Sequence, residues 1–139
     1  MKNLFAFIIF FLALQVAVAQ KQDTITTKSG LKYVMVKAGN GPKPKKGQKV
    51  KIYFTGALPK GDIFDSNADA APFKFTLGDP NVIPGWNEGF QMMTAGEKAV
   101  FILPPSLGYG AAGYKDGDGK VLVPQNSYLI FQVELIGFK

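Results

Sequence analysis

Aromatic and aliphatic residues set between glycine turns form the part of the sequence best suited to binding and chemistry. They occur between residues 64 and 131, in the order Phe64-Asp65-Ser66, Pro72 to Phe75, Val82 to Trp86, Gly108-Tyr109-Gly110 and Leu129 to Phe131. Trp86 is the single tryptophan of the chain. Because rings and aliphatic side chains line most small-ligand sites, this set predicts a pocket for an apolar guest.

The sequence contains few of the side chains that covalent catalysis needs. The chain has no histidine, no cysteine and no arginine, so the common nucleophile–base pairs are missing. A Ser–Lys pair built on Ser106 is formally possible, but no spacing supports it. Zinc sites use histidine and cysteine ligands above all. We therefore expect a site without a metal or cofactor.

Two glycine-rich motifs have simpler explanations than ligand binding. Residues 108–113 match G-x-G-x-x-G, but a dinucleotide site needs a helix directly after the motif, and the turn residues from Tyr114 onward cannot form one. Residues 116–119, Asp-Gly-Asp-Gly, lack the ligand order of a calcium-binding loop. We interpret both as turns.

The positive charge is carried entirely by lysine. The chain has 16 lysines and 10 acidic residues, a formal net charge of +6, and the lysines are densest between Lys43 and Lys51. Such a cluster is typical either of an anionic partner or of a solvated turn and strand edge. Arginine, the better phosphate ligand, is absent. We favour the solvated surface and expect no nucleic-acid partner.

The elements that must position the apolar set are mostly strands. Runs rich in β-branched and aromatic residues predict them, at residues 31–36, 50–55, around Phe64, 73–77, 97–103 and 127–138. One helix is predicted from Pro84, with Trp86, Phe90 and Met93 on one face and an end at Gly96. The fold class is α+β: about five antiparallel strands wrapped around one short helix.

The first 19 residues are typical of a secretory signal peptide. Lys2 precedes an apolar run of 11 residues from Leu4 to Leu14, and Ala17-Val18-Ala19 is a small-residue cleavage site. The run is short for a membrane span, which needs about 20 residues. The predicted organisation is a signal peptide at 1–19, a flexible lead at 20–28 and one domain at 29–139. We expect an exported protein, periplasmic or secreted, with no stable membrane insertion after cleavage.

At these residues the chain resembles the FKBP-type peptidyl-prolyl cis-trans isomerases. The resemblance covers roughly residues 29–138, and it rests on ordered pieces at the family's spacing. These are Ser29 to Tyr33, Phe54-Thr55-Gly56, Phe64-Asp65-Ser66, Pro72 to Gly78, Val82 to Trp86, Gly108-Tyr109-Gly110 and Phe131 to Leu135. The resemblance implies a half-wrapped antiparallel sheet on a short helix, with a proline pocket between them.

The resemblance also implies a role for individual residues. Trp86 would form the floor of the pocket. Its walls would be Phe64, Phe73, Val82, Val123 and Phe131, and Phe54 would be a further substrate-binding residue. The N–H of Ile83 and the hydroxyl of Tyr109 would hold substrate carbonyls, and Asp65 would stand near the twisting carbonyl. The implied ligands are proline-containing unfolded or partly folded polypeptides, and macrolides.

Three departures from the family pattern bear on the activity. Phe54 stands where many members have tyrosine, whose hydroxyl bonds the aspartate. The basic residue common between Asp65 and Phe73 is absent, and the 114–122 loop is longer than in the minimal family domain. The leading prediction is a monomeric isomerase that accelerates X–Pro rotation in exported proteins. The alternative is a chaperone or binding module of the same fold with little isomerase activity.

Overall fold

The computed structural model describes residues 23–139, and the predicted signal peptide lies outside this range. The strands are β1 (Thr24–Thr26), β2 (Lys32–Lys37), β3 (Lys49–Ala57), β4 (Ile63–Ser66), β5 (Phe73–Thr76), β6 (Lys98–Leu103), β7 (Tyr114–Lys115), β8 (Val121–Val123) and β9 (Leu129–Phe138). The helix α2 spans Pro84–Gly89, and 3-10 helices follow at Phe90–Met92 and Pro105–Leu107. Within residues 23–139, no helix is long and apolar enough to cross a membrane.

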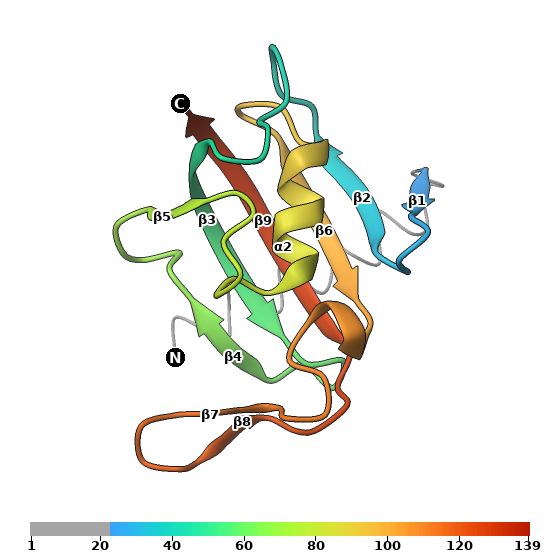
Figure 1. The fold of residues 1–139 in the computed structure, drawn as a ribbon, viewed down its shortest axis with the longest axis vertical. Coiled ribbons are helices and arrows are strands. Elements are labelled where there is room, and N and C mark those ends of the chain that lie inside the picture. Colours follow the sequence, from blue (N-terminus) through green and yellow to red (C-terminus); the bar gives the residue numbers. More distant parts are fainter. Residues whose placement is uncertain (1–22) are drawn as a thin grey trace.

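Seven strands form one antiparallel sheet that wraps around α2. Its order is β1-β2-β6-β9-β3-β4, with β5 pairing β3 beside β4. In Figure 1, α2 lies across one face of this sheet, and the β7–β8 hairpin projects from one end. The predicted α+β class with a single short helix is confirmed. The sheet has seven strands where roughly five were predicted, and the strand that no predicted segment covers is the three-residue β1.

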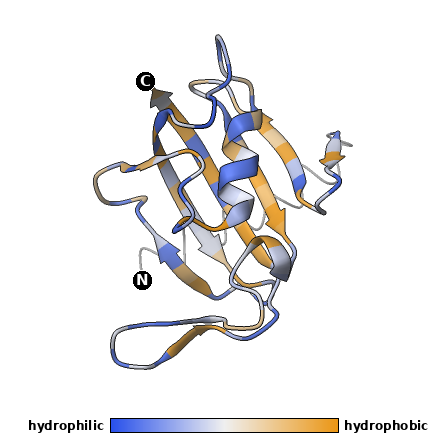
Figure 2. Cartoon of the chain, viewed as in Figure 1, coloured by the Kyte–Doolittle hydropathy of each residue, from blue (hydrophilic) through white to orange (hydrophobic). Residues whose placement is uncertain are grey.

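Alternation along β3 and β9 builds the core. In β9, Leu129, Phe131, Val133 and Leu135 are buried while the residues between them are partly exposed. In a strand, successive side chains point to opposite faces of the sheet. The buried side chains of β9 therefore all lie on one face, the face that packs against the helix. Figure 2 shows the same pattern, with hydrophobic colour along β6 and β9 beneath a helix whose outer side is hydrophilic. The strand predicted at residues 127–138 is confirmed.

Helix α2 begins as predicted and ends earlier. Pro84 occupies its first turn, where the missing N–H costs nothing. Trp86, Phe90 and Met93 are all buried, as their spacing predicts. The prediction that the helix continues to Gly96 is wrong: Met93 has extended backbone angles (φ −96°, ψ 152°), and Ala95 forms an isolated bridge to Asn40. Pairing with that loop therefore replaces the last helical turns.

Two glycines let α2 lie very close to the sheet. Gly85 and Gly89 are four residues apart and so share the buried face of the helix. A Cβ on Gly85 would overlap a Leu103 methyl carbon, and one on Gly89 would lie 2.6 Å from the Phe101 ring. Neither position has room for a side chain, so the absence of Cβ sets the distance between helix and sheet.

Two pairings were missed by the sequence prediction. β1 pairs with β2 through Thr24–Val34 and Thr26–Lys32, so residues 24–26 of the expected flexible lead are in fact a strand. Its side chains are exposed, and backbone pairing on the edge of β2 holds it in place. The β7–β8 hairpin lies in the segment predicted to be only turns. Both elements are too short to carry a clear hydrophobic period.

Glu97 is the one charged residue in the core of the described chain, at 1 % exposure. Its Oε1 accepts bonds from the Thr94 N–H (3.3 Å) and hydroxyl (3.4 Å), while Oε2 has no partner within residues 23–139. Burial raises the pKa of this carboxyl above its usual value of 4.5. Because the folded-state pKa is the higher one, folding gains stability from the protonated form and loses it as pH rises through that pKa.

Replacing Glu97 by glutamine should therefore stabilise the protein more as pH rises. The gain of the variant over the wild type should increase by roughly 1.4 kcal/mol for each unit by which the Glu97 pKa is raised. Urea unfolding of both proteins between about pH 4 and about pH 8 measures this difference. If the difference in unfolding free energy between the two proteins stays constant across that range, the Glu97 pKa is not raised by burial.

Candidate active site

A cavity of about 480 Å³ opens between α2, the β4–β5 connection and the Tyr109 segment. Its lining combines aromatic and aliphatic side chains with a few polar ones. The lining residues are Phe54, Asp65, Ser66, Asn67, Ala71, Pro72, Phe73, Asn81, Val82, Ile83, Trp86, Tyr109 and Tyr114. Seven of the ten predicted site residues thus surround one space, although they come from segments far apart in the sequence.

Trp86 forms the floor of this cavity. The indole is 7 % exposed, so it is covered by protein on all sides except the cavity. Edge-to-face contacts hold it from below, with ring centroids 4.8 Å from Phe54 and 5.3 Å from Phe131. Its Nε1–H has no partner among the described residues. The floor is therefore a rigid aromatic surface, and its unpaired N–H is itself buried.

Phe73 and the residues before α2 form the rim. Phe73 is 43 % exposed, yet its ring lies 6.1 Å from Trp86 and 6.3 Å from Phe54. Ile83 is the residue before Pro84, and its N–H donates to no group in residues 23–139. A free backbone donor at the edge of an apolar cavity can bind a carbonyl oxygen.

Asn87 fixes the loop that carries Val82 and Ile83. Its Oδ1 accepts the Gly78 N–H at 2.8 Å, and its Nδ2 donates to the carbonyls of Asp79 (3.0 Å) and Val82 (3.4 Å). Because a helix residue holds both ends of this loop, Val82 and Ile83 keep a fixed position relative to Trp86. The sequence prediction missed this role, since nothing in the spacing of Asn87 indicates its partners.

Tyr109 and Tyr114 stack on the opposite side of the cavity, with ring centroids 5.1 Å apart. Burial, the Asp65 carboxylate and Tyr114 together raise the pKa of Tyr109 to about 12. The Tyr109 hydroxyl is therefore protonated throughout the physiological range and is a hydrogen-bond donor. Tyr114 was not predicted as a site residue, because the β7–β8 hairpin that carries it was not recognised.

Asp65 stands at the cavity edge with few partners. Its Oδ1 accepts the N–H of the adjacent Ser66 at 2.9 Å, and no ion pair involving it occurs in residues 23–139. The nearby Phe54 has no hydroxyl that could bond it. The carboxylate therefore remains available at the edge of an otherwise apolar space.

Asn67 connects the β4–β5 loop to β3. Its Oδ1 accepts the Phe54 N–H at 2.7 Å, while its Nδ2 donates to the carbonyls of Ile52 (3.1 Å) and Ala71 (3.3 Å). The side chain thus bonds the β3 backbone groups of Ile52 and Phe54 in place of a neighbouring strand. It places the loop between Asp65 and Phe73 against the cavity, a role that the sequence prediction also missed.

Three predicted wall residues lie outside the lining set. Phe131 and Val123 are each 1 % exposed, so both belong to the core, and Phe131 packs against the Trp86 floor. Phe64 is half-buried and packs 5.5 Å from Phe131 and 6.4 Å from Tyr109. Gly56 makes this packing possible, since a Cβ there would lie 2.5 Å from the Phe131 ring. Phe64 and Phe131 therefore support the lining residues from behind.

The site offers binding and little else. Within residues 23–139, no three histidine, cysteine or acidic side chains gather where they could hold a metal. The apolar rings can exclude water from a ligand, and two donors, the Ile83 N–H and the Tyr109 hydroxyl, can hold its carbonyl oxygens. Such a cavity suits a reaction that changes conformation without making or breaking bonds.

Comparison with known proteins identifies similar chains. A sequence profile described as FKBP-type peptidyl-prolyl cis-trans isomerase matches residues 41–136. The chain is 51% identical over 96 residues to FK506-binding protein 2 of Dictyostelium discoideum, covering 68% of each. It is 43% identical over 122 residues to the isomerase FkpA of Aeromonas hydrophila, covering 87% of this chain and 42% of that one. The crystal structure of AtFKBP13 superposes with a TM-score of 0.76 at 34% identity, over 84% of this chain and 99% of that one.

Proposed function

This chain belongs to the FKBP-type peptidyl-prolyl cis-trans isomerase family, and on that basis we propose that its cavity accelerates X–Pro rotation in partly folded polypeptides. The observation that carries the proposal is the Trp86 floor, bordered by Phe73 in a cavity that Tyr109 also lines. The proline ring would lie on the indole. Its flanking carbonyls would reach the Ile83 N–H and the Tyr109 hydroxyl.

Removal of water supplies the rate gain in this proposal. A planar amide has a rotation barrier of about 18–20 kcal/mol, because resonance strengthens the C–N bond. Resonance also places partial charge on oxygen and nitrogen, which water stabilises. A cavity lined by rings withdraws that solvation from the planar form more than from the twisted form, whose charges are smaller. A thousandfold acceleration requires roughly 4 kcal/mol.

Tyr109 tests the donor side of this mechanism. Tyr109→Phe should lower kcat/KM about five- to tenfold, since a neutral hydrogen bond contributes roughly 1 kcal/mol. In the wild type, kcat/KM should stay constant from about pH 6 to about pH 9, because no histidine or cysteine titrates there and the Tyr109 pKa is about 12. A relaxation assay on a neutral Leu-Pro peptide measures both. An unchanged rate in Tyr109→Phe would remove the hydroxyl from the mechanism.

The same assay separates the alternative function. Phe54 leaves Asp65 without a hydroxyl partner, and this departure motivated the idea of a binding module with little isomerase activity. If the purified chain prevents client aggregation but does not accelerate the neutral peptide, the binding module is the better description. We expect acceleration.

Members of the family bind proline peptides and FK506-type macrolides. We propose both ligand classes for this cavity, and we propose that the protein acts as an exported monomer on exported clients. The signal-like residues 1–19 support export. N-terminal sequencing of the protein secreted by its natural host should begin at Gln20. An intact Met1 on that protein would contradict cleavage.

A further inference from the structure

A second cavity, of about 540 Å³, lies where β9 ends beside β3 and β5. It is lined by Lys49, Val50, Lys51, Lys74, Ile136, Gly137, Phe138 and Lys139, with no acidic side chain among them. We name it the lysine groove. It is separate from the Trp86 cavity, because the two share no lining residue.

Strand register explains how the groove arises. Lys74 of β5 lies opposite Lys51 of β3, which in turn lies opposite Gly137 of β9. Lys49 is two residues before Lys51 and so points to the same face. A Cβ on Gly137 would have no heavy atom within 4 Å. Because Gly137 has no side chain, a hollow remains on this face of the sheet, and the lysines border it.

The charges of the groove are unbalanced. Like charges directly opposite each other on neighbouring strands repel, and Lys51 and Lys74 form such a pair. The single ion pair of the described residues joins Lys98 to Glu134, elsewhere on the sheet. An anion in the groove would relieve this repulsion.

We propose that the lysine groove binds an acidic segment of the same polypeptide whose proline occupies the Trp86 cavity. This rests on the proposed function. The strand β5 links the two sites, because Phe73 lies at the rim of one and its neighbour Lys74 lines the other. Adjacent residues of a strand point to opposite faces. A client that passes around β5 therefore contacts both sites.

The geometry sets the spacing of the two client elements. An extended chain advances about 3.3 Å per residue, so roughly five to eight residues between the proline and the acidic segment suffice to pass around one strand edge. Binding at the groove then raises the effective concentration of the proline at the cavity. Binding at the groove should therefore lower KM and leave kcat unchanged, since the groove does not touch the reacting bond.

The experiment compares two peptides on the purified chain. One carries Leu-Pro followed, six residues later, by four glutamates, and the other carries four serines in the same place. The acidic peptide should have a KM roughly tenfold lower at low salt, with equal kcat. The advantage should vanish in about 1 M salt, where screening acts over about 3 Å. Equal KM values at low salt would overturn the proposal.

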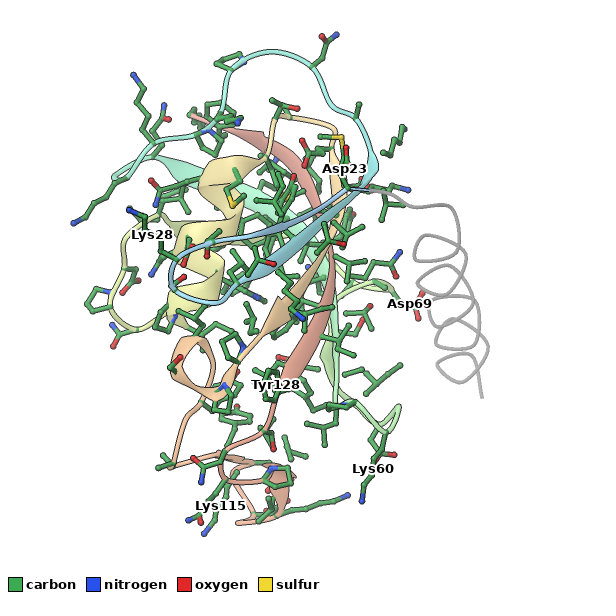
Figure 3. The ribbon with its side chains drawn as sticks, turned by 90° about the vertical axis from the view of Figure 1, so that its right-hand side faces the viewer. Asp23, Lys28, Lys60, Asp69, Lys115 and Tyr128 are labelled. Carbon is green, nitrogen blue, oxygen red and sulfur yellow. The ribbon has the colours of Figure 1, made fainter. Side chains whose placement is uncertain are left out.

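Two variants locate the effect in the groove. Lys49→Gln/Lys51→Gln/Lys74→Gln should abolish the advantage, and Gly137→Leu, which fills the hollow without changing charge, should reduce it. The matched control Lys28→Gln/Lys32→Gln/Lys37→Gln removes equal charge at the opposite edge of the sheet, where Figure 3 labels Lys28. The control should keep the advantage. If the control loses as much of the KM advantage as the groove variant, the effect comes from overall charge and the proposal is overturned.

A direct binding measurement separates this proposal from the isomerase activity. A fluorescent tetraglutamate peptide without proline should bind the wild type, as read by anisotropy, and should not bind the triple groove variant. If the neutral peptide is isomerised but the tetraglutamate does not bind, the groove proposal fails and the function stands. Binding to phosphatidylglycerol vesicles in the absence of peptide binding would likewise overturn it, in favour of a membrane surface.

Discussion

Replacing Trp86 by leucine should lower kcat/KM on a neutral Leu-Pro peptide by roughly thirtyfold. The indole lines the floor of the cavity, and its edge-to-face contacts with Phe54 and Phe131 hold it in place under the ligand. If it supplies about half of the roughly 4 kcal/mol that a thousandfold acceleration requires, its loss costs about 2 kcal/mol in the transition state. Relaxation of the peptide, followed with and without enzyme, gives the ratio.

The control for Trp86→Leu is Tyr128→Leu. Tyr128 is 54% exposed and lies outside the cavity lining, at the position labelled in Figure 3. Its replacement should leave the rate within a factor of two. Circular dichroism and thermal unfolding of both variants establish that the fold persists. Equal rates for wild type and a folded Trp86→Leu protein would mean that the indole is not the floor of the reacting site.

Gly89→Leu should destabilise the protein by about 3 kcal/mol, the upper part of the usual range for overfilled cores. Any side chain at this position meets the Phe101 ring at 2.6 Å, and the ring is itself fully buried. The helix must then move away from the sheet. Because Trp86 lies on the same helix, kcat/KM should fall together with the thermal midpoint, which should drop by roughly 10 °C or more.

Gly117→Leu is the matched control for that substitution. Gly117 lies between β7 and β8, and a Cβ there has no heavy atom within 4 Å. The identical change in side chain should therefore shift the midpoint only slightly. A Gly89→Leu protein as stable as Gly117→Leu would contradict the close approach of α2 to the sheet.

Sequence patterns predicted the parts of the fold that rest on hydrophobic period. The alternation in β9 and the face shared by Trp86, Phe90 and Met93 both follow from which side chains can be buried. These patterns depend only on residues close together in the chain, so a single sequence is enough to predict them. The bounds of α2 were less predictable, because a bridge between Ala95 and Asn40 decides where the helix ends.

The site was predictable in its aromatic residues and unpredictable in its polar supports. Trp86, Phe73 and Tyr109 could be assigned from their types and their resemblance to a family pattern. Asn67 and Asn87 could not, since each acts by bonding backbone groups of a distant segment. Phe131 and Val123, which the resemblance assigns to the wall, are buried and lie outside the cavity lining, because a family pattern does not distinguish a wall from the layer behind it.

The most direct test of the account is where a proline ring lies on the protein. Intermolecular nuclear Overhauser effects between a bound Leu-Pro peptide and the purified chain report which side chains touch the pyrrolidine. We predict contacts from its ring protons to Trp86, Phe73 and Tyr109, all of which line one cavity. Contacts confined to the lysine groove, or to the cleft that Tyr53 and Gln132 line, would contradict the account.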